Sequence, residues 1–246
     1  MVDVRPNGNR PVVLFDMDDT LFDHTFALRG ALARVWRDDP PLRRRPFRSV
    51  LTTYTRLLDE IHPEVLQHRR THAEARQERF RRLFDWAGVP RSPAEFEELS
   101  VRYRTEYQAL RRPVPGALTL LRSLRGRATV GVVSNNHTTE QRDKMAATGL
   151  VEFVDFLVTS EDAGSEKPAP AIFRTALQLA NRGPDEAVMV GDTWSTDIVG
   201  ARALGIRAVW LNRAGQARPD SASEVLELRS LVPARRLARR LLAPDW

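Results

Sequence analysis

The sequence contains no cysteine, and only two of its 38 basic residues, Lys144 and Lys167, are lysine. The absence of cysteine excludes disulfide bonds and thiolate-ligated metal sites. Lysine differs from arginine in carrying a compact ammonium group instead of a planar guanidinium fork. In a chain so rich in arginine, the lysine at position 167 is therefore a candidate for a site that needs a compact positive charge.

The sequence also lacks any run of roughly 18 consecutive apolar residues, the length that a membrane-spanning helix needs. Its N-terminal residues show no long apolar stretch before a cleavage site, so we expect no secretory signal and no membrane partner. Together with the absence of cysteine, this favours a cytoplasmic location. The 246 residues suffice for one large domain or for a core domain with an insertion.

The formal charge of +6 attracts anions, which include phosphorylated metabolites and nucleic acid. The arginines are scattered along the chain, which is typical of a solvated basic surface, so we expect no nucleic-acid partner. The stretch Ala234 to Leu242 alternates arginine pairs with leucines. This pattern favours a terminal helix that packs its leucines on the domain over a helix that binds a membrane surface. No pattern predicts an oligomeric state.

Five short apolar runs are typical of buried parallel strands, because they do not alternate with polar residues. They are Val12 to Phe15, Thr129 to Val133, Phe156 to Thr159, Ala187 to Val190, and Ala208 to Leu211. Helical stretches separate the last four runs. We therefore predict an α/β fold, a Rossmann-like parallel sheet wound by helices on both faces.

The gap between the first two runs is much longer than one helical crossover. It contains no convincing strand, but apolar and aromatic residues recur in it at helical spacing: Phe96, Leu99, Tyr103, Tyr107 and Leu110. We predict an all-helical domain over residues 23–112, inserted into a catalytic core of residues 1–22 and 113–246.

Four polar clusters follow these runs. They are Asp16 to Thr20, Ser134 to Asn136, Glu166 to Pro168, and Asp192 with Asp197. In an open parallel sheet, ligands bind in the crevice at the carboxyl ends of the strands, so the clusters are expected to converge. Each cluster alone is compatible with a helix cap or a turn. Four of them in order at strand ends favour a functional site.

The predicted site holds several carboxylates, one lysine, hydroxyl groups and backbone amides, but no cysteine or histidine at the strand ends. Crowded carboxylates repel each other unless a cation joins them. Oxygen ligands favour a hard ion such as Mg²⁺. A magnesium ion and a lysine together neutralise a phosphate dianion, as phosphoryl transfer requires.

The ordered motifs resemble those of the haloacid dehalogenase superfamily. They are DxDxT at Asp16 to Thr20, a strand-end Ser134, Lys167, and the acidic pair Asp192 and Asp197. The segment from Pro115 to Asn212 further resembles the branch that contains nucleoside monophosphate and acylneuraminate phosphatases. The resemblance implies a magnesium-dependent phosphatase with a helical (type 1) cap. Asn136 departs from the family pattern, since relatives often have glycine there.

The resemblance also assigns roles to the site residues. Asp16 is the nucleophile that forms an aspartyl-phosphate, and Asp18 is the general acid and base. The magnesium ligands are Asp16, the backbone carbonyl of Asp18, and Asp192. Phosphate is held by Ser134, Asn135 and Lys167, with Thr20 and Asp197 in support. The expected substrate is a small phosphorylated metabolite: a nucleoside monophosphate, then a sugar phosphate or phosphoglycolate.

Other functions remain open. A phosphomutase of the same fold uses the same pair of aspartates. A haloacid dehalogenase releases halide, which needs no proton, so Asp18 argues for an oxygen leaving group. A non-catalytic nucleic-acid-binding protein would bind with a steep salt dependence and would leave the strand-end acids without a role. A scaffold that has lost activity is disfavoured by the intact set of Asp16, Asp18, Lys167 and Asp192.

Overall fold

The computed structural model describes residues 10–219 and 225–243. Residues 1–9, on which the expectation of no secretory signal depends, and residues 244–246 of the predicted core lie outside these ranges. The chain divides into two compact units. We call the first, Met1–Asp23 with Arg112–Trp246, the core unit, and the second, His24–Arg111, the helical unit.

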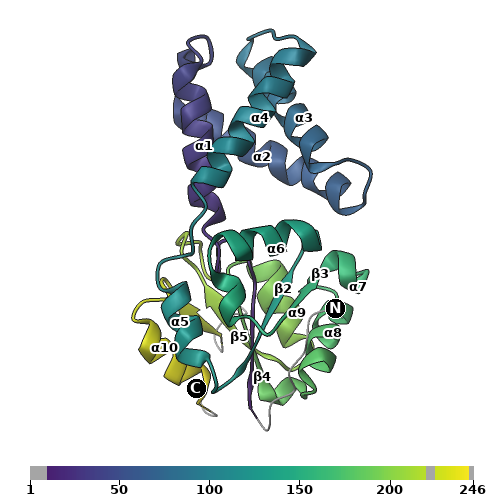
Figure 1. Ribbon diagram of the computed structural model, residues 1–246, viewed down its shortest axis with the longest axis vertical. Coiled ribbons are helices and arrows are strands. Elements are labelled where there is room, and N and C mark those ends of the chain that lie inside the picture. The colour runs from purple at the N-terminus through teal and green to yellow at the C-terminus, as the bar shows by residue number, and fades with distance from the viewer. Residues whose placement is uncertain (1–9, 220–224, 244–246) are drawn as a thin grey trace. The chain divides into compact units, whose positions relative to one another are not determined.

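The core unit is built on a six-stranded sheet in the order β3-β2-β1-β4-β5-β6, in which every neighbouring pair is parallel. The strands are β1 (Val12–Phe15), β2 (Thr129–Ser134), β3 (Phe156–Thr159), β4 (Ala187–Gly191), β5 (Arg207–Leu211) and β6 (Leu226–Leu228). The helices are α5 (Ala117–Leu124), α6 (Thr138–Ala147), α7 (Ser160–Ala163), α8 (Pro170–Ala180), α9 (Val199–Arg202) and α10 (Ala234–Leu241). Figure 1 shows helices on both sides of the sheet, so the predicted fold class is confirmed.

The strands that the sequence predicted are buried on both faces. All four residues of β1 are buried, and Val12 and Leu14 pack in one cluster with Ile172 and Phe173 of α8. Successive side chains of a strand point to opposite faces, so a strand covered on both sides needs apolar residues throughout. The core therefore forms where the continuous apolar runs predicted it.

Two elements near the C-terminus differ in how well the sequence predicted them. The predicted terminal helix is present as α10, which packs against α5 and buries Leu237 and Leu241 while its arginines are exposed. Strand β6 was not predicted. It has three residues, all partly exposed, and it pairs with the end of β5. A segment so short carries no apolar run.

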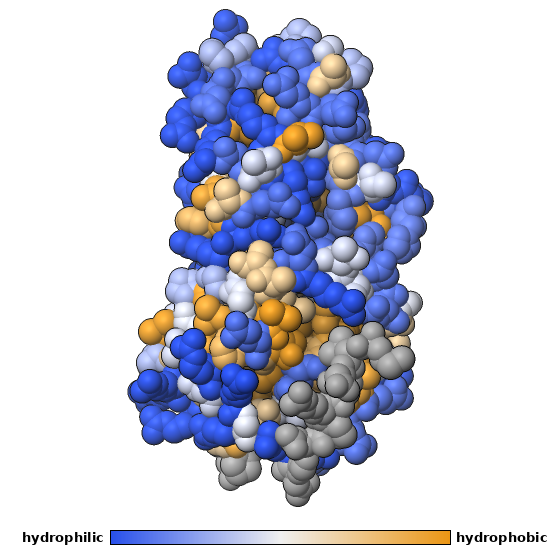
Figure 2. Space-filling model, viewed as in Figure 1, coloured by the Kyte–Doolittle hydropathy of each residue, from blue (hydrophilic) through white to orange (hydrophobic). Residues whose placement is uncertain are grey.

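The helical unit consists of α1 (His24–Asp38), α2 (Phe47–Leu66), α3 (His72–Ala87) and α4 (Pro93–Ala109), with a short 3₁₀ turn at Leu42–Arg44. Its core contains the rings of Tyr54, Phe80 and Tyr103, whose centroids lie 5.4 to 5.6 Å apart. The face shown in Figure 2 is largely hydrophilic over these helices, with small apolar groups between. Within the described ranges, no helix combines the length and the apolar character needed to cross a membrane.

Helices α3 and α4 both begin with a capping box. The Thr71 side chain accepts a hydrogen bond from the Glu74 backbone N–H, and the Glu74 carboxylate accepts one from the Thr71 backbone. Ser92 and Glu95 form the same reciprocal pair at α4. Each box satisfies backbone donors that have no partner inside the helix. The starts of these two helices are thus fixed by local sequence.

Candidate active site

The carboxyl ends of three central strands bring predicted site residues to one edge of the sheet. Asp16 follows β1, Ser134 ends β2, and Asp192 follows β4. The register pairs the last residue of β1 with Val132 of β2 and Val190 of β4, so these three strands end close together at the same edge of the sheet. Residues that are far apart in the sequence become neighbours because parallel strands end together.

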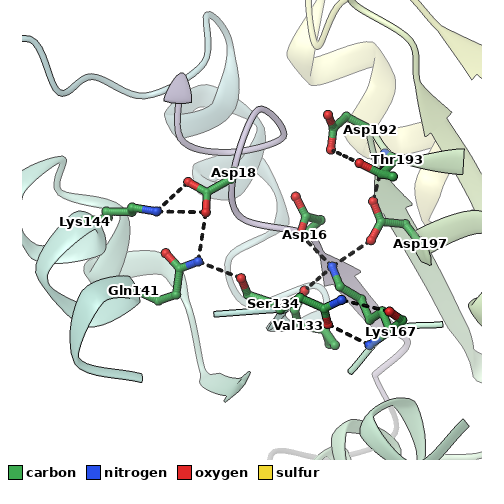
Figure 3. Close-up of polar contacts among 11 residues, drawn as sticks. Asp16, Asp18, Val133, Ser134, Gln141, Lys144, Lys167, Asp192, Thr193 and Asp197 are labelled. Atoms are coloured by element: carbon green, nitrogen blue, oxygen red, sulfur yellow. Dashed lines mark hydrogen bonds and ion pairs between the residues drawn. The ribbon is translucent and has the colours of Figure 1, made fainter. Parts of the chain in front are cut away.

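Lys167 is buried at the centre of this edge, with 4% of its surface exposed. Its Nζ donates hydrogen bonds to Asp16 Oδ1 at 2.6 Å, to Asp197 Oδ1 at 2.7 Å and to the Val133 carbonyl at 2.8 Å (Figure 3). These three bonds use all the donors of an ammonium group. Burial alone would lower the pKa of Lys167, but the charges of Asp16 and Asp197 outweigh it and raise the pKa above its usual value. Lys167 is therefore a fixed positive charge.

Asp197 is presented by a π-helical turn, η4 (Trp194–Ile198), directly after β4. Its Oδ2 accepts a hydrogen bond from the Thr193 backbone N–H at 3.0 Å, and its Oδ1 accepts one from Lys167. The neighbouring Asp192 is held through its backbone carbonyl, which accepts a hydrogen bond of 2.8 Å from the Trp210 indole. The turn after β4 thus holds the Asp197 carboxylate, and Trp210 of β5 holds the backbone at Asp192.

Three carboxylates share the space around Lys167. An oxygen of each of Asp16, Asp192 and Asp197 lies within 4.8 Å of the others. Burial and the charge of Asp197 outweigh the attraction of Lys167 and raise the pKa of Asp16 from 3.8 to about 7. Burial and the charges of Asp16 and Asp197 raise the pKa of Asp192 from 3.8 to about 9. One ammonium cannot neutralise three carboxylates, so the cluster fits a bound divalent cation.

Asp18 faces a different partner. Lys144 of α6 donates to Asp18 Oδ1 at 2.7 Å and to Oδ2 at 2.8 Å, and the Gln141 amide donates to Oδ2 at 3.0 Å. In Figure 3 the Asp18 carboxylate points towards these two side chains, away from Lys167. The two aspartates of the DxD motif are therefore each paired with one of the two lysines of the chain.

The segment after β2 contributes side chains in two ways. Ser134 is buried, and its Oγ accepts a hydrogen bond of 2.7 Å from the Gln141 amide. The Asn135 side chain joins the Lys167 backbone: its Nδ2 donates to the carbonyl at 2.8 Å, and its Oδ1 accepts from the N–H at 2.7 Å. Asn135 thus fixes the Lys167 loop with its side chain.

The loop after β1 is held by contacts that the sequence did not predict. Asp19 has a positive φ of 60°, and Arg213 donates to its carbonyl at 3.1 Å. Arg213 also donates to Asp23 at 2.8 Å, and Asp23 accepts a second arginine, Arg112, at 2.9 Å. The Thr20 hydroxyl, expected to support the site, is buried and has no hydrogen-bond partner among the described residues.

Comparison with known proteins agrees with this geometry. The sequence matches the haloacid dehalogenase-like hydrolase family over residues 11–205. The chain belongs to this family. The match confirms the predicted superfamily, and the four motifs of this haloacid dehalogenase-like protein lie within the matched residues.

Two relatives and two solved structures illustrate the range of the family. The chain is 37% identical to the pyrimidine 5'-nucleotidase YjjG of Escherichia coli over 48% of this chain and 53% of that protein, about half of each. It is 29% identical to the glyceraldehyde 3-phosphate phosphatase of Pyrococcus abyssi over 81% of this chain and 80% of the relative.

Among solved structures, the hydrolase YfnB of Bacillus subtilis, which was crystallised with magnesium, is 22% identical, with a TM-score of 0.72 over 95% of this chain and 99% of that one. At this identity the likeness shows the fold alone. The 2-haloacid dehalogenase of Pseudomonas syringae is 29% identical, with a TM-score of 0.61 over 94% and 99% of the two chains.

Sequence patterns did not single out Gln141, Lys144 or Arg213 as site residues. Gln141 and Lys144 lie within α6, Lys144 in its last turn, where polar residues are usually exposed, and no strand end marks them. One signal was present for Lys144, because the scarcity of lysine applied to it as much as to Lys167. Nothing in the sequence indicated that Arg213 would reach Asp19 and Asp23.

Proposed function

We propose that the chain is a Mg²⁺-dependent phosphomonoester hydrolase that acts through an aspartyl-phosphate. The observation that carries the proposal is the buried Lys167 ammonium held between Asp16 and Asp197, with an oxygen of Asp192 within 4.8 Å of an oxygen of each. This arrangement supports Asp16 as the nucleophile, Lys167 as a fixed positive charge and the three carboxylates as a cation-binding cluster. The named phosphatases among the relatives support the same reaction class.

In the proposed reaction, a carboxylate oxygen of Asp16 attacks phosphorus while the bond from phosphorus to the ester oxygen breaks. Asp18 gives its proton to the departing oxygen, so that an alcohol leaves. In the second half, Asp18 takes a proton from a water molecule that attacks phosphorus, and the bond to Asp16 breaks. Inorganic phosphate is released, and both aspartates return to their starting state.

The remaining residues hold the phosphoryl group. Lys167 offsets charge between the nucleophile and the phosphate oxygens, and the Ser134 hydroxyl and the backbone N–H of Asn135 donate to those oxygens. Bound Mg²⁺, held by the carboxylates of Asp16 and Asp192 and the carbonyl of Asp18, would stabilise negative charge on the transferring group. Asp197 supports this set by fixing Lys167.

We propose a small phosphorylated metabolite as the substrate. A nucleoside monophosphate, a sugar phosphate and phosphoglycolate are the classes to test first, and the nucleotidase and glyceraldehyde 3-phosphate phosphatase among the relatives support the first two. We propose that the helical unit, inserted between β1 and β2, is the cap domain that selects among them. Its basic side chains include Arg76, which is partly buried and contacts Ser100.

Dehalogenation is the second candidate, because a solved 2-haloacid dehalogenase is 29% identical to the chain. Displacement of a halide by a carboxylate needs no proton donor. The presence of Asp18, held by two donors, therefore favours an oxygen leaving group over a halide. A phosphomutase would use the same two aspartates but would return the phosphoryl group to a sugar rather than to water.

The test is phosphate release from a panel of phosphomonoesters, with Mg²⁺ or with a chelator, by the wild-type chain and by Asp16→Asn. We expect release that needs both Mg²⁺ and Asp16. Halide release from 2-haloacids and phosphoryl transfer between sugar phosphates are measured in parallel. Activity in one of those assays without phosphate release would overturn the proposal, as would phosphate release that survives Asp16→Asn.

A further inference from the structure

Lys144 is an unusual residue for a helix of this chain. It is one of two lysines, it lies on α6, and only 2% of its surface is exposed. Burying an ammonium group costs several kcal/mol unless an anion and hydrogen bonds compensate for the lost hydration. A role as a solvated surface charge is therefore excluded, and the identity of its partner matters.

The partner is Asp18. The Lys144 ammonium contacts both carboxylate oxygens, at 2.7 and 2.8 Å, and lies 5.3 Å from the centre of the Phe22 ring in the same loop. Both contacts lie on the segment that follows β1, so Lys144 ties α6 to the catalytic loop. An ion pair to two oxygens of one carboxylate also restricts its rotation.

Gln141 extends this contact to the phosphate site. It lies one helical turn before Lys144 and is fully buried. Its amide group donates one hydrogen bond to Asp18 Oδ2 at 3.0 Å and another to Ser134 Oγ at 2.7 Å. Because the Ser134 oxygen is the acceptor, its own hydrogen is free to point to a phosphate oxygen. One side chain thus orients both the acid/base and a phosphate donor (Figure 3).

We propose that Lys144, assisted by Gln141, is a positioning residue that fixes the Asp18 carboxylate for both proton transfers. The proposal rests on the proposed function, since it concerns the group that protonates the leaving oxygen and activates water. Asp18 is the member of the DxD pair with the more exposed side chain, 29% against 11% for Asp16. A partly solvated carboxylate has several accessible rotamers, and two buried donors on α6 select one of them.

The proposal predicts a dependence on the leaving group. p-Nitrophenolate departs without protonation, whereas an alkoxide does not. In Lys144→Met we expect kcat/KM for an alkyl phosphate to fall about 100-fold, the size of effect that misplacing a catalytic group produces. For p-nitrophenyl phosphate, kcat/KM should change only a few-fold. Hydrolysis of the aspartyl-phosphate should then limit turnover, so that kcat falls and one equivalent of p-nitrophenolate appears as a burst.

Three further variants complete the experiment. Lys144→Arg keeps a charge and is expected to recover part of kcat, and Gln141→Leu is expected to show the same leaving-group dependence more weakly. Arg142→Met changes an exposed basic residue of the same helix and is expected to behave as the wild type. Met is close to lysine in length and apolar, so Lys144→Met adds no buried charge. Circular dichroism of every variant shows whether the fold is kept.

The outcomes separate the two proposals. Wild-type protein that hydrolyses neither ester contradicts the proposed function itself. If the wild type is active and depends on Asp16, but Lys144→Met and Gln141→Leu lower kcat/KM equally for both esters without a burst, the residues are structural and the positioning role is wrong. Unchanged kinetics in both variants would overturn it equally.

Discussion

Gly191, the last residue of β4, leaves the space that the Asp197 side chain occupies. A Cβ atom at position 191 would lie 2.3 Å from Asp197 Oδ2 and 2.4 Å from its Cβ. Asp197 in turn accepts a hydrogen bond from Lys167. The absence of a side chain at Gly191 is therefore a condition for the position of the site lysine.

We predict that Gly191→Ala will displace Asp197 and lower kcat/KM about 100-fold, since a shift of the order of 1 Å at a site has that effect. Gly30→Ala is the control. There the added atom would meet only the end of the flexible Leu110 side chain, so activity should be unchanged. Steady-state kinetics decide the matter, and wild-type activity of Gly191→Ala would contradict the steric argument.

Lys167 is predicted to stabilise the core unit as well as to bind phosphate. Lys167→Met leaves the buried Asp16 and Asp197 without their shared cation, and breaking a buried ion pair in this way costs about 3–5 kcal/mol. The free energy of unfolding, measured with denaturant in the presence of chelator, gives the loss. Adding Asp197→Asn to Lys167→Met should recover part of it. A Lys167→Met protein as stable as the wild type would show that the carboxylates are already neutral.

The metal-free protein should lose stability as the pH rises. The pKa values of Asp16 and Asp192 are about 7 and about 9 in the folded state, against 3.8 for an ordinary aspartate. At pH values between the ordinary pKa and these raised pKa values, the folded protein therefore binds more protons than the unfolded one. The free energy of unfolding therefore falls with increasing pH in this window. If Mg²⁺ binds the ionised carboxylates as proposed, it should stabilise the protein more at high pH, by about 2.7 kcal/mol at a concentration 100 times its Kd.

Calorimetric Tm values with and without Mg²⁺ at about pH 5.5 and about pH 8.5 test this linkage. Asp192→Asn is the matched variant: it removes one cation ligand and one raised pKa, so both the Mg²⁺ effect and the loss of stability at high pH should shrink. A Mg²⁺ effect of equal size at both pH values, or one that is undiminished in Asp192→Asn, would count against the carboxylate cluster as the binding site.

The capping boxes should affect only the stability of the helical unit. Thr71→Ala and Ser92→Ala each remove a side-chain acceptor at a helix start, which costs about 1 kcal/mol. Chemical denaturation should show this loss, while kcat on p-nitrophenyl phosphate should not change. Thr52→Ala, at an exposed position inside α2, is the control and should not destabilise. A loss of kcat in Thr71→Ala or Ser92→Ala would mean that these helix ends also take part in turnover.

Local sequence was enough to predict five of the strands and the helical stretches between the last four of them, because their signals are local. A strand buried on both faces must be apolar throughout, so β1 and β4 could be predicted without a partner. Asp16 and Asp192 could be placed at a common edge from strand direction alone, because parallel strands end together. Strand β6 was not predicted, because its three half-buried residues form no apolar run and become a strand only by pairing with β5.

The sequence by itself determined the family, the sheet and, at its edge, the acidic groups together with Lys167. Only the tertiary structure decided how these groups are paired: Lys167 with Asp16 and Asp197, and Lys144 with Asp18. Both lysines are rare in this arginine-rich sequence, but only Lys167 lies in a polar cluster that follows a predicted strand. Which carboxylate each one meets depends on how α6 and the loop before α8 pack on the sheet, and such packing is a sum of many distant contacts that no local pattern records.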